Sequence, residues 1–280
     1  MIKFGRRRIW ALAALQLAFA YVWVFEPNWI EVTRHEISIP TLPSEFDGVT
    51  LAQLSDLHIR TFGLRERRTV QLLAEAKPDL IVISGDFTVE GSDAGAISRF
   101  LLHLRDLRPP LGTLAVLGNH DHWHPPVQSP GAIVPFFSDA GATILTNEFA
   151  RIREGSQVVV IAGVDDPFTG HADLRRALEG SPPDTFTLLL SHSPEIFPET
   201  ARTQVNLVLA GHTHGGQLRL PFLDPLWLPH GSESYVSGWF ELGPARMFVT
   251  RGIGTAILPF RFLCRPELPL ITLRVGRRAP

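Results

Sequence analysis

The sequence has few of the residues that mark a disulfide-stabilised domain or a basic nucleic-acid-binding protein. A single cysteine among 280 residues excludes an intrachain disulfide framework. The formal net charge is −2, so we expect no nucleic-acid partner, and nothing in the sequence indicates a protein partner. The composition, 45% hydrophobic and 19% charged, is typical of one globular domain, or at most two. A chain of this length can bury a core without help from a metal or a disulfide.

The first thirty residues differ from the rest in being basic and then apolar. After a basic start, the stretch Ile9–Phe25 is apolar except for Gln16. As a helix, its 17 residues would span about 26 Å, near the lower limit for crossing a bilayer. The preceding basic residues favour a cytoplasmic N-terminus and a domain outside the cytoplasm. We therefore predict a basic segment with a membrane anchor over residues 1–30 and one folded domain over residues 31–280.

Two alternatives to an anchor remain open at this point. Ala18-Phe19-Ala20 has the small residues of a signal-peptidase site, which would make the segment a cleaved secretory signal. Apolar residues continue past this site, which favours an uncleaved anchor. The second alternative is a helix packed within a soluble protein. A helix that lies in the membrane interface, without crossing, would leave the domain in the cytoplasm.

From residue 31 onward, short apolar runs alternate with glycine, proline and aspartate, which predicts an α/β fold. The second half has more strands and fewer helices than the first, so we expect a second sheet packed on the first. The predicted strands cover residues 50–55, 80–84, 113–117, 157–162, 185–190, 207–210, 246–250 and 269–274. The predicted helices cover residues 64–76, 94–107, 133–140 and 173–178.

Five of these strands are followed immediately by residue types that bind metals. In chain order they are Asp56 and His58, then Asp86, then Asn119 with His120 and Asp121, then His192, and finally His212 and His214. The carboxyl ends of the strands of an α/β sheet form a common crevice, so these side chains are expected to converge. Each motif alone is more typical of an ordinary turn. A structural role gives little reason for five strands to end in this way, so together they indicate a metal site.

In this order the motifs resemble those of the calcineurin-like metallophosphoesterases. The family pattern is Asp-x-His, Gly-Asp, Gly-Asn-His-Asp, a single His and Gly-His-x-His, and every position is present here. The resemblance covers residues 48–275 and implies a four-layer α/β/β/α sandwich, here with an N-terminal apolar helix. The chain is most similar to the membrane-anchored bacterial branch, on the segments SDLHI, GHTHGGQ at Gly211–Gln217, Gly252–Gly254 and Arg261–Glu267. His122 departs from the pattern, because a tyrosine is expected before the tryptophan.

The resemblance implies a dinuclear metal centre in which Asp86 bridges two divalent ions. One ion would be bound by Asp56, His58, Asp86 and His214, and the other by Asp86, Asn119, His192 and His212. A bridging hydroxide would attack phosphorus, while His120 protonates or stabilises the departing oxygen. Asp121 is a second catalytic candidate, which could orient the His120 imidazole. The mixed carboxylate, imidazole and amide ligands favour manganese, with iron or zinc as alternatives, over calcium.

Other residues have both a functional and a structural interpretation. The candidates for substrate binding are Trp123, Arg251, Arg261 and Arg265. The arginines could bind a second phosphate or lipid headgroups, although ordinary surface arginines fit equally well. The segment Leu218–Pro229 is too apolar for a typical exposed loop. It either packs over the sheet or forms a hydrophobic patch that contacts acyl chains or the membrane, with Phe222 and Trp227 as the contact residues.

These observations predict a metal-dependent phosphoester hydrolase held at the bacterial inner membrane by a single N-terminal anchor. By resemblance, some members of this branch hydrolyse the pyrophosphate of UDP-2,3-diacylglucosamine in lipid A synthesis. The anchor, the basic residues and the apolar segment favour a lipid-linked phosphodiester or pyrophosphate of that kind. One alternative is a phosphodiesterase or phosphatase that acts on small soluble phosphoesters outside the cytoplasm. Another is a metal-binding scaffold without catalysis.

Overall fold

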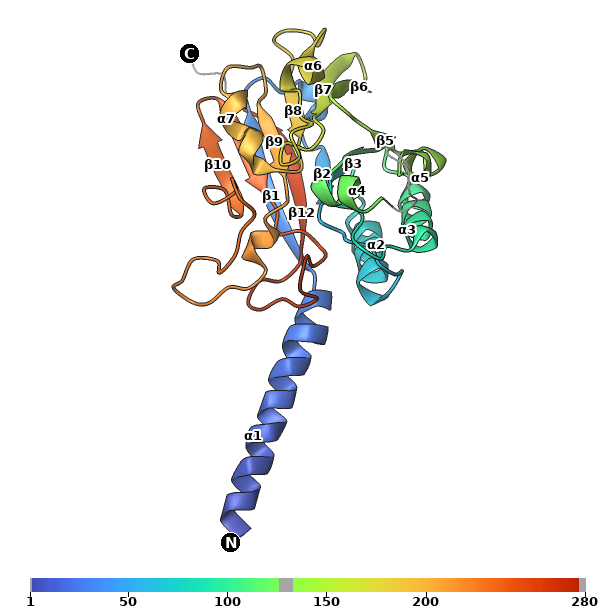
Figure 1. Ribbon diagram of the computed structural model, residues 1–280. Coiled ribbons are helices and arrows are strands. Elements are labelled where there is room, and N and C mark those ends of the chain that lie inside the picture. The colour runs from blue at the N-terminus through green and yellow to red at the C-terminus, as the bar shows by residue number, and fades with distance from the viewer. Residues whose placement is uncertain (1, 126–132, 277–280) are drawn as a thin grey trace.

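The computed structural model describes residues 2–125 and 133–276, and within them two six-stranded sheets form the centre of the molecule (Figure 1). The first sheet has the strand order β1-β12-β2-β3-β4-β5. Strands β2 to β5 are parallel, and β12 joins them antiparallel to β2. The bounds are β1 (Glu31–Ile39), β2 (Thr50–Leu54), β3 (Leu80–Ser84), β4 (Thr113–Val116), β5 (Thr143–Ile144) and β12 (Glu267–Val275).

The second sheet has the order β10-β11-β9-β8-β7-β6. Its four central strands are parallel, and its two edge strands are antiparallel to their neighbours. The bounds are β6 (Glu148–Glu154), β7 (Gln157–Gly163), β8 (Thr187–Leu190), β9 (Leu207–Ala210), β10 (Gly238–Leu242) and β11 (Ala245–Val249). Because the central strands of both sheets are parallel, each sheet has one edge at which several carboxyl ends gather.

Three apolar cores separate four layers, which confirms the predicted α/β/β/α sandwich. The core between the sheets contains side chains of both, among them Leu51, Val82 and Leu188. The outer face of the first sheet packs against α2 (Leu64–Ala76), α3 (Ala94–Leu107) and α5 (Val134–Asp139). The outer face of the second packs against the shorter α6 (Leu174–Leu178) and α7 (Phe197–Thr200). The four helices predicted from periodicity are therefore confirmed as α2, α3, α5 and α6.

The strands that the sequence did not predict are β1, β5, β6 and β10, and all four lie at sheet edges. Central strands are buried on both faces and are recognised as continuous apolar runs. An edge strand has polar residues among the apolar ones, as in β1, where exposed Arg34 and Glu36 alternate with half-buried or buried positions. The sequence also gave no signal for α4 (Asn119–Trp123), the single-turn helix that begins at a predicted metal ligand.

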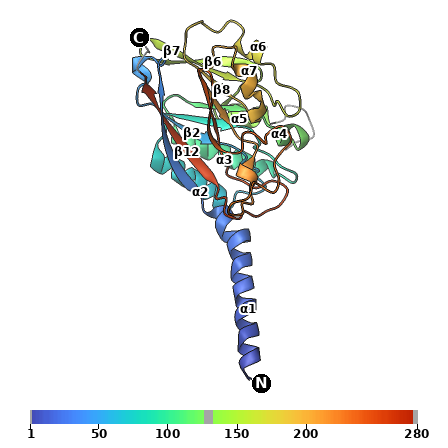
Figure 2. The same ribbon diagram turned by 90° about the vertical axis from the view of Figure 1, so that its left-hand side faces the viewer.

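An apolar helix projects from one end of the body (Figures 1 and 2). Helix α1 (Ile2–Ala20) continues through a π-helical turn, Tyr21–Phe25, and a 3₁₀ turn, Glu26–Asn28. The stretch Arg8–Asn28 is long and apolar enough to cross a membrane by length and composition, and only 6% of its apolar window is buried. Most of this stretch does not pack against the domain, which favours an anchor or a signal over a packed helix.

The base of this helix contacts the folded domain, while the predicted boundary after residue 30 stays a prediction. The Glu26 side chain is fully buried, and its Oε1 accepts a hydrogen bond from the Cys264 backbone N–H at 2.6 Å. The Arg261 backbone N–H donates to Val22 O at 3.2 Å. The Trp23 ring lies 4.6 Å from the Phe260 ring, between centroids. Residues 260–264 therefore attach the helix to the domain.

Candidate metal centre

All seven predicted metal ligands lie where parallel strands of the two sheets end, and all seven are buried. They follow five strands in turn: β2 (Asp56 and His58), β3 (Asp86), β4 (Asn119), β8 (His192) and β9 (His212 and His214). The structure therefore brings together residues from both halves of the chain at one edge, as the strand-end pattern predicted.

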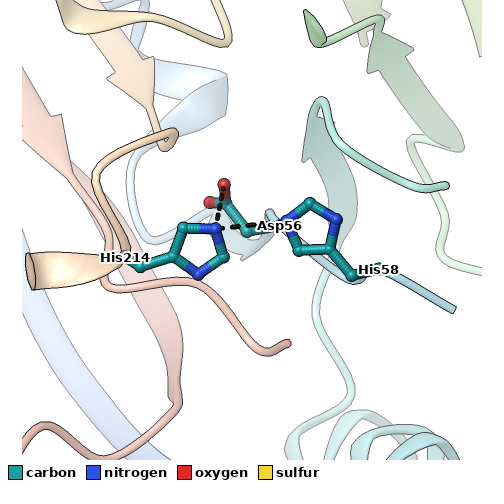
Figure 3. A group of neighbouring side chains, drawn as sticks. All are labelled: Asp56, His58 and His214. Carbon is teal, nitrogen blue, oxygen red and sulfur yellow. Dashed lines mark hydrogen bonds and ion pairs between the residues drawn. The ribbon is translucent and has the colours of Figure 1, made fainter. Parts of the chain in front are cut away.

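The first group consists of Asp56, His58 and His214 (Figure 3). One ligand atom from each lies within 4.8 Å of the other two, which is close enough to bind one metal ion. His214 Nε2 is 3.3 Å from Asp56 Oδ1 and 3.1 Å from His58 Nε2. Figure 3 shows the two imidazoles turned toward each other, with the carboxylate beside them.

The second group consists of Asp86, His192 and His212, again with ligand atoms within 4.8 Å of one another. His192 Nε2 is 3.3 Å from Asp86 Oδ2 and 3.1 Å from His212 Nδ1. Asn119 Oδ1 is also 3.1 Å from this nitrogen. Asp86 Oδ2 lies 3.6 Å from His58 Nε2 of the first group. The Asp86 carboxylate thus lies between the two groups, where a bridging ligand must be.

Backbone carbonyls determine which ring nitrogen of two histidines faces the site. His58 Nδ1 lies 3.0 Å from Thr88 O, and His192 Nδ1 lies 2.8 Å from Ser84 O. Each Nδ1–H therefore donates to a carbonyl, and each Nε2 is directed at the ligand groups. At His192 this nitrogen faces the Asp86 carboxylate, which can only accept. These groups require a positive charge between them, so the residues fit a divalent ion at each site.

The pKa values of the histidines agree with this interpretation. Burial lowers the pKa of both His58 and His212 to about 3 and lowers that of His214 well below its usual value. These three rings are neutral and can act as ligands. For His192, burial opposes the charged form, but Asp86 and Asp56 outweigh it and raise the pKa to about 10. A metal ion must displace a proton there, so metal affinity should fall as the pH is lowered.

The backbone at the site is strained in a way that the sequence did not indicate. Five of the seven ligands have left-handed backbone conformations, with φ values of 51° at Asp56, 45° at His58, 55° at Asp86, 70° at His212 and 51° at His214. This conformation costs a residue with a side chain about 1–2 kcal/mol. Such strain persists only where the surrounding structure imposes it, and it is concentrated at functional sites. It turns these side chains from the strand ends into the crevice.

His120 lies beside the ligand groups without belonging to either. Its backbone N–H donates to Asp86 Oδ1 at 2.8 Å, and its ring centroid is 4.8 Å from that of His58. Burial lowers the pKa of the imidazole, and its Nδ1 has no hydrogen-bond partner among the described residues.

The carboxylate of Asp121 is hydrogen-bonded to backbone and to Thr88, and no hydrogen bond to the His120 imidazole is found among the described residues. Asp121 Oδ2 accepts from the Gly118 N–H at 2.9 Å, and Oδ1 accepts from the N–H and hydroxyl of Thr88 at 2.8 and 2.9 Å. Both oxygens thus join the first turn of α4 to the loop after β3. These bonds position the backbone that carries Asp86 and Asn119, and a catalytic role of Asp121 stays a prediction.

A cavity of about 550 Å³ opens in front of the ligands. One side is formed by ligand residues and His120, and the other is largely aromatic and apolar. Trp123, predicted to bind substrate, is part of this wall. The sequence did not reveal Phe168, whose ring lies 4.8 Å from that of His212, because it follows no recognisable motif. His122, the residue that departs from the family pattern, pairs with Asp165: its Nε2 lies 2.7 Å from Asp165 Oδ1.

The three arginines proposed to bind substrate do not line this cavity, so the structure gives that prediction no support. Arg261 is fully buried and donates to the backbone carbonyls of Gly254 and Cys264. Arg251 is paired with Glu31 at 2.8 Å and Glu267 at 3.3 Å. The Arg265 guanidinium lies 3.9 Å above the Trp29 ring centroid. Their charges stabilise the segment next to the helix base.

The segment Leu218–Pro229 is largely exposed and does not pack over the sheet. The exposed side chains are Leu220, Phe222, Leu223, Leu226 and Trp227, of which Phe222 is fully exposed. The segment therefore exposes an apolar patch, and its contact with acyl chains or the membrane stays a prediction. Trp227 also lines the cavity, so the patch reaches the metal centre.

Comparison with known proteins agrees with this geometry. Residues 49–216 match the family model of the calcineurin-like phosphoesterases. The chain belongs to this family and is a metal-dependent phosphoester hydrolase.

Several relatives are similar over most of the chain. It is 35% identical over 261 residues to YkuE, an uncharacterized metallophosphoesterase of Bacillus subtilis strain 168. This alignment covers 91% of this chain and 90% of YkuE. It is 30% identical over 279 residues to the phosphodiesterase YaeI of Escherichia coli K12, covering 96% and 99%. It is 31% identical over 263 residues to a Bos taurus transmembrane protein with a metallophosphoesterase domain, covering 88% and 57%.

Proposed function

We propose that this protein hydrolyses a phosphodiester or pyrophosphate bond of a lipid-linked substrate at the membrane surface. One observation carries the proposal: a single segment joins the metal-binding crevice to the apolar helix. Ile257 lines the cavity, and Phe260, three residues later, packs on Trp23 at the helix base. A substrate held in the membrane beside α1 would therefore lie close to the metal ligands. UDP-2,3-diacylglucosamine is one candidate substrate.

The proposed chemistry uses two divalent ions, with manganese best suited to the mixed ligands. When bound, such ions supply an activated water and stabilise negative charge on the phosphate. Asp86 holds the two ligand groups together, and the carbonyls of Thr88 and Ser84 keep His58 and His192 in the ligating orientation. His120 donates a proton to the departing oxygen. Burial lowers its pKa, and an arriving phosphate raises it again, so protonation accompanies substrate binding.

The N-terminal helix is proposed as an uncleaved anchor in the bacterial inner membrane. The basic residues before it favour a domain outside the cytoplasm. The exposed apolar segment Leu218–Pro229 supports a second contact with the membrane, made by Phe222 and by the edge of Trp227.

The test is a substrate panel with the full-length, manganese-loaded protein reconstituted in vesicles. We expect hydrolysis of lipid-borne diesters or pyrophosphates at a higher kcat/KM than that of phosphomonoesters or soluble diesters. The Asp86→Asn variant should lose both metals and several orders of magnitude in activity, whereas Asp139→Asn, an exposed carboxylate on α5, should match the wild type. An Asp86→Asn variant that keeps two metals and near-normal turnover would contradict the dinuclear assignment.

A phosphodiesterase for small soluble esters is the second candidate, and the similarity to the phosphodiesterase YaeI agrees with either kind of diester. It predicts equal or better hydrolysis of soluble diesters in the same panel. A protein that binds metals but hydrolyses no member of the panel would instead be a metal-binding scaffold.

A further inference from the structure

A second cavity of about 310 Å³ adjoins the metal-binding crevice and is lined almost entirely by apolar groups. We call it the apolar groove. Its walls are formed by His214, Gly216, Gln217, Leu218, Trp227, Ala256, Ile257 and Leu258. It shares His214, Trp227 and Ile257 with the crevice, so the two cavities adjoin beside the metal ligands.

The two walls of the apolar groove are fixed to each other by one buried side chain. Gln217 Nε2 donates to Ala256 O at 3.2 Å and to Leu258 O at 2.9 Å. Its Oε1 accepts a hydrogen bond from the Ala256 N–H at 3.0 Å. The peptide groups on either side of Ile257 are thereby tied to the loop that carries His214. The groove is a built feature and not a chance gap between two loops.

Ile257 is held in a conformation that is unfavourable for its residue type. Its φ is 59°, in the left-handed region, and its side chain is 68% exposed. A β-branched residue is strongly disfavoured at such a φ, and glycine would relieve the strain and remove apolar surface from water. An isoleucine that has both backbone strain and an exposed apolar side chain is expected where this side chain contacts a ligand.

We propose that the apolar groove binds the hydrocarbon chain of the lipid whose phosphoester bond is hydrolysed. The inference rests on the proposed function and names its substrate class: a phosphodiester that carries an alkyl or acyl chain. No Asp, Glu, Lys or Arg lines the groove among the described residues, which disfavours a headgroup or a peptide. The segment that carries Ile257 and Leu258 continues into the contact with α1, at the end of the body from which the helix projects (Figure 1). A chain from the membrane thus has a direct route into the groove.

The test uses nitrophenyl diesters of phosphate whose second ester group is lengthened from methyl to octyl. Water adds its oxygen to phosphorus, the bond to nitrophenolate breaks, and alkyl phosphate and a proton are released. For the full-length, manganese-loaded protein in one detergent, we expect kcat/KM to rise about twofold to fourfold per methylene until the groove is filled. Ile257→Gly and Leu258→Ser should flatten this dependence. Because partition of each ester into micelles is the same for every variant, the ratio of wild type to variant isolates the groove.

Two features keep the result interpretable. Ile257→Gly places the favoured residue at a left-handed position, so its melting temperature should not fall, and a loss of chain-length dependence cannot be attributed to misfolding. Val275→Ser is the matched control, because Val275 is an exposed apolar residue at the end of β12 and lies outside the groove. It should keep the wild-type dependence.

Wild-type chain-length dependence in both groove variants would overturn the proposal. Its loss in Val275→Ser as well would show a general surface effect, and would also overturn it. Failure of the wild type to hydrolyse any ester of the series is a different result, because it contradicts the proposed function and, with it, the role of the groove.

Discussion

At the scale of single residues, hydrogen-bond partners distinguish the metal ligands from the residues next to them in the sequence. His58 and His192 are oriented by backbone carbonyls, whereas the buried Nδ1 of His120 has no partner among the described residues. Adjacent residues of one motif therefore have different roles: Asn119 faces the ligands, His120 faces the cavity, and Asp121 holds the backbone.

Replacing His120 tests the proton-donor role. His120→Ala should lower kcat by roughly 10²–10⁴ on diesters with poor leaving groups, the usual range for general acid catalysis. A nitrophenyl ester, whose leaving group needs no proton, should lose much less. Metal content, measured by plasma mass spectrometry, should equal that of the wild type, since His120 is not in either ligand group. Equal losses on the two kinds of ester would argue against proton donation.

The pair His122–Asp165 gives a pH-dependent contribution to stability. The hydrogen bond to Asp165 raises the pKa of His122 above its ordinary value of 6.5. Because the pKa is raised in the folded state, the ion pair stabilises the fold fully below pH 6.5. This stabilisation is lost as the pH rises through the pKa that His122 has in the folded protein. His122→Ala should therefore lower the free energy of unfolding by about 1.5 kcal/mol at pH 6 and by much less at pH 9.

Urea unfolding at the two pH values measures this difference, with metal content held equal. The exposed His103 on α3 provides the control, and His103→Ala should show no such dependence on pH. A deficit of His122→Ala that is as large at pH 9 as at pH 6 would mean that packing, and not the ion pair, carries the stability.

At the scale of elements, residues 260–264 join the helix base to the domain. Glu26 accepts the Cys264 N–H from within the buried interior, so this glutamate belongs to the fold although it follows an apolar helix. The sequence does not reveal this contact, because its two partners are 238 residues apart.

Truncation on either side of Glu26 should separate the anchor from the fold. A protein that begins at Asn28 leaves the buried Cys264 N–H unpaired and should be about 1–3 kcal/mol less stable than one that begins at Tyr21. Urea unfolding of the two truncated proteins measures this difference. The point variant Glu26→Ala in the longer protein should reproduce most of the loss. Equal stability of all three would show that the Glu26 contact contributes nothing.

At the scale of the whole molecule, the crevice, the apolar patch and α1 share one end, and this arrangement predicts a dependence on how the substrate is presented. The protein that begins at Tyr21 should hydrolyse a soluble diester at the full-length rate, because it keeps both ligand groups. On a diester lipid in vesicles it should be slower, since α1 holds the full-length protein at high local concentration beside that substrate.

Initial rates of both proteins on both substrates measure the effect. Phe222→Ser in the truncated protein should weaken vesicle binding further, as followed by co-sedimentation. Equal rates of the two proteins on vesicle-borne lipid would mean that the helix only localises the protein, and would favour the soluble-ester alternative.

The sequence by itself determined the central strands, the principal helices and the seven candidate ligands. Central strands are apolar along their whole length, and each ligand follows its strand directly, so both are visible in local order. Only the tertiary structure decided the four edge strands, the hydrogen bonds of Asp121 to the backbone, the burial of Arg261 and the contact of Glu26 with Cys264. It also placed the apolar groove between the ligands and α1. These features depend on contacts between distant segments, and a residue type alone does not show which segment its side chain will meet.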